Sequence, residues 1–197
     1  TRSGTVAKPI VIRSENFLGA TITGKIEIQA DNIILYGVEH KAIVVGNKNT
    51  SGARAANFRL WRCWARGPNL GGDGGIVVNC GRATDMDVAF CEFGPDITGR
   101  AFLTSYQNGS RRPTWRYCYF HDTPEGFRVT SNGGECIQTG DDPTPGGVEN
   151  RLEALIYRCK IRNWNSETEQ PSIKNSGCIV KQCTLEDCTV GTRGAVI

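Results

Sequence analysis

The chain has 197 residues, enough for one sizeable core, and a formal net charge of +3. Its Lys and Arg residues are scattered, and no basic block is interleaved with aromatic residues, so we expect no nucleic-acid partner. No apolar run is long enough to cross a bilayer and the N-terminus carries no charged-then-apolar leader, so we expect no membrane partner.

The N-terminal part of the chain reads as three strands. Residues 9–13 and 20–28 alternate as strands do, and residues 32–38 form another strand-like run bounded by turn residues. No stretch has a convincing helical period over three turns. We therefore expect a nearly all-β protein with loops emerging on one side.

Five later segments share one pattern, in which a Cys follows a strand-like run: 58–64, 86–93, 114–120, 154–161 and 178–185. In four of the five, the position two beyond the Cys is Phe, Ile or Leu. The cysteines are separated by 28, 27, 41 and 24 residues. A period in this range with strand-length units indicates a solenoid. We interpret the 41-residue step as one coil plus an insertion within residues 123–148.

These repeats predict a parallel β-helix that covers residues 1–197 as a single domain. Each unit is too small to bury its apolar face alone, so equivalent residues of neighbouring coils should stack in ladders. Cys residues stacked at the strand spacing of about 4.8 Å place their Cβ atoms somewhat too far apart for an unstrained disulfide. Because the chain also has no CxxC pair, we expect a reduced internal Cys ladder and no redox or metal role for it.

Candidate functional residues concentrate in the last third of the chain. Glu167 and Glu169 are two residues apart, so on a strand both carboxylates project from the same face. Two carboxylates with a nearby amide oxygen suit Ca²⁺. The spacing alone fits a solvated pair on a surface strand better than it fits a metal site.

The order of several motifs in this region is more specific. Residues 132–140 read NGGECIQTG, Glu167 and Glu169 form an E-x-E pair, Lys174 stands five residues beyond the pair, and Arg193 follows about one coil later. This order resembles polysaccharide lyase family 6, which contains the alginate lyases and chondroitinase B. Residues 8–14, and Thr23-Gly24 before a strand, are also similar to the first coils of that family.

The resemblance implies a right-handed β-helix that cleaves a uronic-acid polysaccharide by β-elimination, with alginate as the first expectation and chondroitin or dermatan sulfate as the second. Carried over, the Ca²⁺ ligands are Asn132, Glu167 and Glu169, the base is Lys174, and Arg193 assists it. Removal of the proton at C5 develops negative charge beside a carboxylate, and a bound Ca²⁺ neutralises that charge. The resemblance also implies a secreted or periplasmic protein whose partner is an anionic polysaccharide.

Further site residues follow from their positions in the motifs. We expect Trp164, just before the Glu pair, to contact sugar, and Gln138, which stands where the family usually has Arg, to contact substrate. Trp61 and Trp115 fall within the repeated strands, so we expect them to pack. The chain ends four residues after Arg193, whereas family members continue for several coils. This leaves three interpretations: a fragment lacking C-terminal coils, a minimal catalytic variant, or part of an assembly that covers this end.

Two other functions remain open, as does the oligomeric state. One is a non-catalytic carbohydrate-binding β-helix of the tail-fibre or adhesin type, which would release no unsaturated product. The other is an epimerase or hydrolase on the same fold, ranked lower because the Glu pair lies along one strand and would not flank a bond. For His121-Asp122, at the end of a strand, we expect a turn hydrogen bond rather than a catalytic dyad.

Overall fold

The computed structural model describes residues 2–46, 54–67, 76–104, 110–124, 134–139, 152–164 and 170–188. Every regular element in these ranges is a strand, and they hold no helix long and apolar enough to cross a membrane. Strands β1 (Ile10–Arg13), β2 (Thr21–Ile28) and β3 (Ile33–Tyr36) confirm the three strands predicted at the N-terminus.

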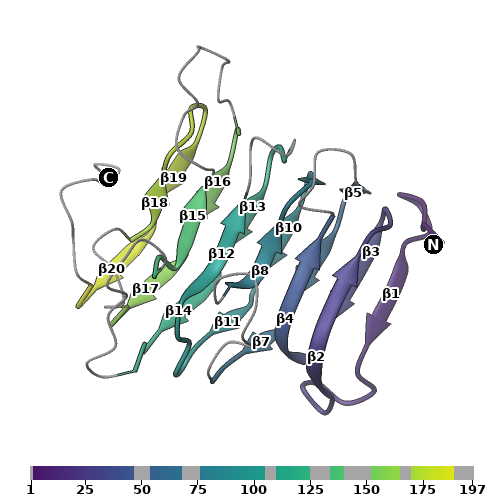
Figure 1. The fold of residues 1–197 in the computed structure, drawn as a ribbon, viewed down its shortest axis with the longest axis horizontal. Coiled ribbons are helices and arrows are strands. Elements are labelled where there is room, and N and C mark those ends of the chain that lie inside the picture. The colour runs from purple at the N-terminus through teal and green to yellow at the C-terminus, as the bar shows by residue number, and fades with distance from the viewer. Residues whose placement is uncertain are drawn as a thin grey trace.

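Strands of successive coils pair in parallel, so the molecule is a parallel β-helix with the coils stacked along its long axis (Figure 1). One seven-stranded sheet has the order β1, β3, β6 (Arg59–Trp61), β10 (Asp87–Ala89), β13 (Thr114–Arg116), β16 (Leu155–Tyr157), β19 (Ile179–Lys181). We call its outer surface the β13 face. A short pair, β5 (Ala55–Ala56) with β9 (Ala83–Thr84), lies apart from it.

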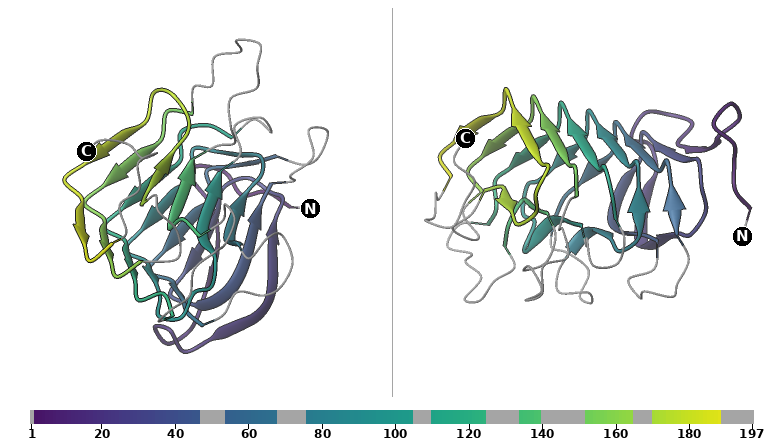
Figure 2. Two further views of the ribbon diagram at one scale, coloured as in Figure 1. Left: turned by 60° about the vertical axis from the view of Figure 1, so that its left-hand side comes forward. Right: turned by 90° about the horizontal axis from the view of Figure 1, so that it is seen from above.

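The second, eleven-stranded sheet bends into two faces. Its order is β18 (Ser172–Ile173), β15 (Ile137–Thr139), β12 (Arg100–Thr104), β8 (Ile76–Cys80), β4 (Glu39–Val45), β7 (Trp64–Ala65), β11 (Glu92–Phe93), β14 (Tyr119–His121), β17 (Lys160–Arg162), β20 (Thr184–Glu186), with β2 beside β4. Strand β4 pairs with β7 through its first residues and with β8 through its last, so it spans both faces. We call the surface of β7, β11, β14, β17 and β20 the β14 face, and that of β8, β12, β15 and β18 the β15 face. The right-hand view of Figure 2 shows the coils side by side.

The interior is filled by ladders of equivalent residues. One row beneath the β13 face is Leu35, Leu60, Val88, Trp115, Ile156 and Val180. A row beneath the β14 face is His40, Ala65, Phe93, Phe120, Ile161 and Leu185. The last five residues of this second row stand two positions beyond the repeated cysteines, which explains the apolar residue that recurs there. Burial of one such side chain contributes about 1.5–3 kcal/mol.

The repeated cysteines line one corner of five consecutive coils, between the β13 and β14 faces. The residue before each Cys has a positive φ, between 50° and 56°. This left-handed residue turns the chain, so each repeated segment is two short strands joined by a corner rather than one strand. The thiols of Cys63, Cys91 and Cys118 donate to carbonyl oxygens of the preceding coil at 3.5, 3.2 and 3.5 Å. All nine cysteines are free thiols, in agreement with the predicted reduced ladder.

The region predicted as an insertion contains a regular strand. Within residues 123–148, β15 pairs with β12 in the register Phe102 to Ile137 and Leu103 to Gln138. The 41-residue step therefore contains one coil, as predicted, and that coil places β15 inside residues 123–148. The extra length is divided between the connections before and after β15.

Candidate functional site

The β15 face brings two of the predicted site residues together. Gln138 pairs with Ser172 of the next coil, and the backbone N–H of Lys174 donates to the carbonyl oxygen of Thr139 at 3.2 Å. Ile137 belongs to the core and Ile173 packs against it. Because side chains alternate along a strand, Gln138 and Lys174 both belong to the outer side of the sheet. They lie in adjacent coils, two positions apart in the strand register.

Exposure differs between these two residues. Lys174 is partly exposed, whereas the side chain of Gln138 is 4% exposed. The amine is therefore within reach of solvent, while most of the amide is covered by neighbouring atoms. The substrate contact expected of Gln138 stays a prediction.

Four of the predicted site residues, Asn132, Glu167, Glu169 and Arg193, lie outside the described residues. Among the described residues, no group of three or more His, Cys, Asp or Glu side chains is arranged to hold a metal ion. The donor chemistry of the predicted set, two carboxylates and one amide oxygen, is nevertheless the hard oxygen set that Ca²⁺ prefers.

The described residues that flank Asn132 and the pair of Glu167 and Glu169 are hydrogen-bonded to one another. The indole Nε1 of Trp164 donates to the carbonyl oxygen of Gly134 at 2.7 Å. The backbone N–H of Cys136 donates to Oε1 of Gln170, also at 2.7 Å. Residues 134–136 follow Asn132, and Trp164 and Gln170 bracket the Glu pair. The two segments that carry the predicted Ca²⁺ ligands therefore join the described chain at neighbouring points.

Trp164 itself is not a sugar contact. Its side chain is fully buried and packs edge-to-face against Phe120, with ring centroids 6.3 Å apart. The preceding Asn163 has φ 48°, a corner like the one before each repeated Cys, and such a corner turns the next residue inward. A ring without exposed surface cannot stack on a polymer, so the structure corrects this prediction.

A buried ion pair beneath this face was missed by the sequence analysis. Nε of Arg100 lies 2.8 Å from Oε2 of Glu135, and the two side chains are 13% and 0% exposed. Glu135 belongs to the NGGE segment, but its partner is 35 residues away and becomes a neighbour only through the coil register. The pair ties the start of β12 to Glu135, two residues before the strand that carries Gln138.

The β14 face holds a second polar cluster. His121 contacts Asp122 through Nδ1 at 2.9 Å and Glu92 through Nε2 at 3.1 Å, and its ring stacks on Tyr119. Hydrogen bonds from His121 and Asn163 lower the pKa of Asp122. The predicted turn hydrogen bond is confirmed. Nε2 joins His121 to Glu92 of the preceding coil, whereas Nδ1 contacts the next residue of its own coil.

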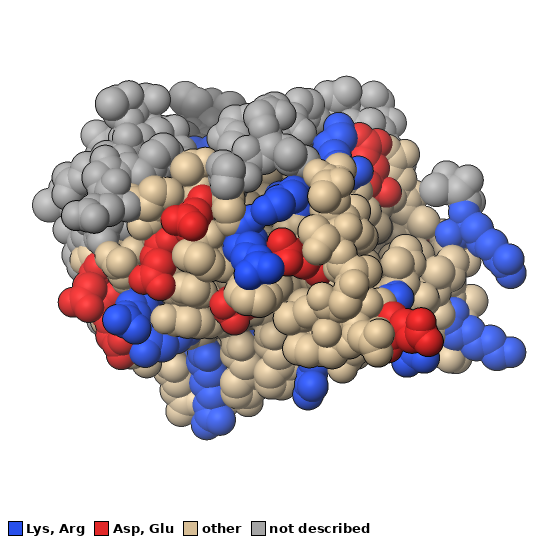
Figure 3. All heavy atoms as spheres, turned by 90° about the horizontal axis from the view of Figure 1, so that it is seen from below, with Lys and Arg blue, Asp and Glu red and all other residues tan. Residues whose placement is uncertain are grey.

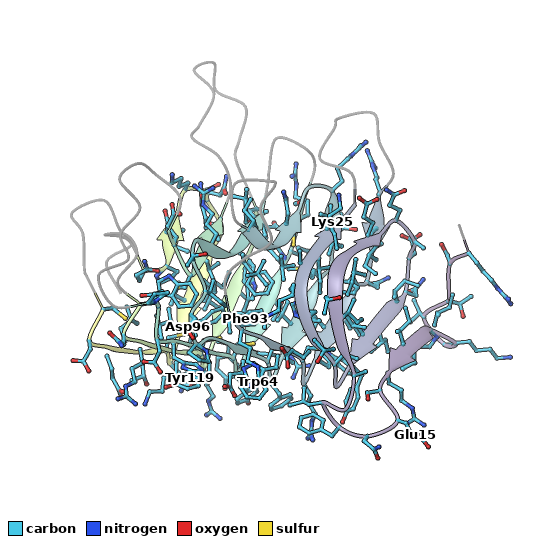
Figure 4. The ribbon with its side chains drawn as sticks, turned by 60° about the horizontal axis from the view of Figure 1, so that its bottom comes forward. Glu15, Lys25, Trp64, Phe93, Asp96 and Tyr119 are labelled. Atoms are coloured by element: carbon cyan, nitrogen blue, oxygen red, sulfur yellow. The ribbon has the colours of Figure 1, made fainter. Side chains whose placement is uncertain are left out.

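The arrangement of side chains on the β14 face also agrees with a structural role for this cluster. Trp64 and Tyr119 lie along its outer side, whereas Phe93 lies within the coil (Figure 4). Acidic and basic side chains are interspersed over the described part of this face (Figure 3). Nζ of Lys160, for example, lies 2.8 Å from Oε2 of Glu186. Paired charges of this kind offer little attraction to a polyanion.

No family model, curated protein or solved structure matches this chain. The fold is established by the strand pairing, and the functional interpretation depends on the residues of the β15 face and the motifs beside them.

Proposed function

We propose that this chain is a Ca²⁺-dependent polysaccharide lyase that cleaves a uronic-acid polymer by β-elimination, with alginate the first substrate and chondroitin or dermatan sulfate the second. The observation that supports it most is that Gln138 and Lys174 lie on the outer side of adjacent coils, two positions apart in the strand register. These residues come from two separate elements of the lyase-like motif order, 36 positions apart.

In the proposed reaction Lys174 removes the proton at C5 of the uronate. The electron pair of that C–H bond forms the C4–C5 double bond, and the glycosidic C4–O bond breaks with its electrons left on the departing oxygen. Arg193 binds the negative charge that develops on the uronate carboxylate, because a guanidinium is a strong charge partner and a poor proton donor. The partial exposure of Lys174 leaves its amine accessible to a polymer from solvent.

Asn132, Glu167 and Glu169 are the residues that would hold Ca²⁺. The ion supplies positive charge that neutralises the substrate carboxylate. The hydrogen bonds of Trp164 to Gly134 and of Cys136 to Gln170 support this assignment, because they join the described neighbours of the two ligand segments.

The test is absorbance in the ultraviolet band of a 4,5-unsaturated uronate, with alginate, chondroitin sulfate and dermatan sulfate as substrates. We expect absorbance to rise on one polymer in the presence of Ca²⁺, and to stay flat with a chelator or in Lys174→Ala. Lys25→Ala is the matched control, since Lys25 is an exposed Lys on β2, in a different coil. A flat trace on every polymer from folded protein would contradict the proposal and leave the non-catalytic carbohydrate-binding alternative.

A further inference from the structure

The corner between the β13 and β14 faces carries an exposed stack of aromatic and cationic side chains. Phe90 and Tyr117, from adjacent coils, are 51% and 39% exposed, and their rings are parallel with centroids 5.0 Å apart. The guanidinium of Arg62 lies 5.9 Å from the Phe90 ring, and that of Arg158 lies 6.0 Å from the Tyr117 ring. We call these four residues the corner ladder. It runs along the long axis over four consecutive coils.

The last residues of β6, β10, β13, β16 and β19 form a parallel row beside this ladder, in which Ala89 is buried. The register places Trp61, Ala89, Arg116, Tyr157 and Lys181 in that row. Trp61, for which we expected packing rather than sugar contact, lies on the outside and is partly exposed. We call this set the outer row.

Cations pack against the aromatic rings of the outer row as well. The guanidinium of Arg59 lies 5.2 Å from the Trp61 ring, and that of Arg158 lies 5.2 Å from the Tyr157 ring. The corner ladder and the outer row therefore form one continuous surface of rings and cations.

Much of the positive charge on this surface is not neutralised by carboxylates. Arg59, Arg62, Arg158 and Lys181 form no ion pair with any described residue, and the guanidinium of Arg158 donates instead to the amide oxygen of Gln182. Arg116 of the outer row is paired with Asp87, and on the β14 face Arg66 and Lys160 are paired with Glu39 and Glu186. The surface thus concentrates attraction for anions in a chain whose total charge is only +3.

We propose that the corner ladder and the outer row form a binding surface for an extended acidic polysaccharide, whose chain lies along the stack of coils. Coils repeat at about 4.8 Å, so Arg59 and Arg62 in one coil, and Arg158 and Lys181 three and four coils further along, present spaced positive charges to a linear polymer that bears repeated carboxylates. Stacking on aromatic rings holds the guanidinium groups in place before the ligand arrives, which lowers the entropy lost on binding.

The stacking also favours a polysaccharide over a single-stranded nucleic acid. Nucleic-acid platforms need open ring faces on which bases stack. Here Phe90 and Tyr117 cover one face of each other, and Arg62 and Arg158 approach the rings from either end of the ladder. What remains accessible is a set of cations and ring edges, which suits carboxylates and hydroxyls.

The uronate identity of this polymer depends on the proposed function, whereas the surface itself does not. It lies on the β13 face and the corner beside it, while Lys174 belongs to the β15 face. It would therefore hold polymer as an anchoring surface separate from the residues of the proposed chemistry.

Isothermal titration calorimetry with alginate oligosaccharides of defined length, at low salt, tests the surface. The protein carries Lys174→Ala so that the ligand is not cleaved, and Arg62→Gln with Arg158→Gln is introduced on that background. We expect affinity to fall about tenfold, because two cation–carboxylate contacts are lost. The control is Lys25→Gln with Arg162→Gln, which removes the same charge from other parts of the surface and should leave affinity nearly unchanged. Circular dichroism confirms that each variant is folded.

Absence of binding, an unchanged affinity in the double Arg variant, or an equal loss in the control would each overturn the proposal. Tighter binding of single-stranded DNA than of the oligosaccharides would also overturn it. The lyase assay separates this surface from the proposed function. If no unsaturated product forms but oligosaccharide binding depends on Arg62 and Arg158, the surface stands and the lyase assignment falls.

Discussion

The indole Nε1 of Trp164 donates a hydrogen bond to the carbonyl oxygen of Gly134, 30 residues earlier in the chain, at 2.7 Å. Trp115 is equally buried, but its Nε1 has no hydrogen-bond partner. The two residues therefore provide an internal comparison, because one indole N–H joins two coils and the other only occupies space in the core.

This comparison leads to a prediction on stability. Trp164→Phe and Trp115→Phe remove similar volumes from the core, but only the first removes a hydrogen bond. We expect Trp164→Phe to lower the free energy of unfolding by about 1 kcal/mol more than Trp115→Phe does. Urea denaturation followed by circular dichroism measures both. Equal losses in the two variants would mean that the hydrogen bond contributes nothing to stability.

The Arg100–Glu135 pair leads to a second prediction. Breaking a buried ion pair leaves one charge without its partner, so we expect Glu135→Gln to reduce the free energy of unfolding by about 3 kcal/mol. The exposed pair of Lys25 and Glu27 is the control, since its N–O distance is also 2.8 Å but its side chains are 50% and 48% exposed. Glu27→Gln should cost less than about 1 kcal/mol. Similar losses in both variants would contradict the role assigned to burial.

The solenoid could be predicted from the sequence because the same strand-and-Cys pattern recurs along the chain even where the loop lengths between repeats differ. The corners could not. They place Arg62, Phe90 and Tyr117 at positive φ, a backbone conformation that Gly and Asn adopt most readily. Once the corner is known, the exposure of these residues follows, because the left-handed residue turns outward and the Cys after it turns inward.

The candidate site was predictable to a similar extent. The order of motifs marked Gln138 and Lys174 as site residues, and the strand register shows that they lie in adjacent coils. The orientation of Trp164 depends on the corner at Asn163, which has φ 48° and which the sequence pattern did not reveal. The pairing of Arg100 with Glu135 depends on the register of β12 with β15, and the predicted insertion concealed that register.

The cysteines lead to a third prediction. Burial raises the pKa of the Cys91 and Cys136 thiols, and Cys178, Cys183 and Cys188 are the only cysteines that are not fully buried. We expect iodoacetamide at neutral pH to alkylate only these last three in the native protein, slowly, and all nine after unfolding. Mass spectrometry of the labelled peptides locates the modified residues. Rapid native labelling at Cys91 or Cys136 would show that the ladder is accessible.

His40 leads to the last prediction, on pH. It is fully buried beside Phe93 with no partner for either ring nitrogen, and desolvation, with a smaller contribution from Lys41, lowers its pKa from 6.5 to about 3. Between these two pH values the unfolded chain binds a proton that the folded chain does not. The contribution of neutral His40 is therefore complete above pH 6.5 and declines by about 1.4 kcal/mol per pH unit as the pH falls toward 3.

His40→Leu should remove this part of the pH dependence while leaving stability at pH 7 unchanged or higher, because an apolar side chain replaces two unpaired polar atoms. Urea titrations from pH 7 to pH 4 on both proteins give the difference in slope directly. His121→Asn is the control for the only other histidine, and it should retain the His40 slope. If His40→Leu and the unmodified chain lose stability in parallel as the pH falls, His40 is protonated in the folded protein and its burial without a partner is disproved.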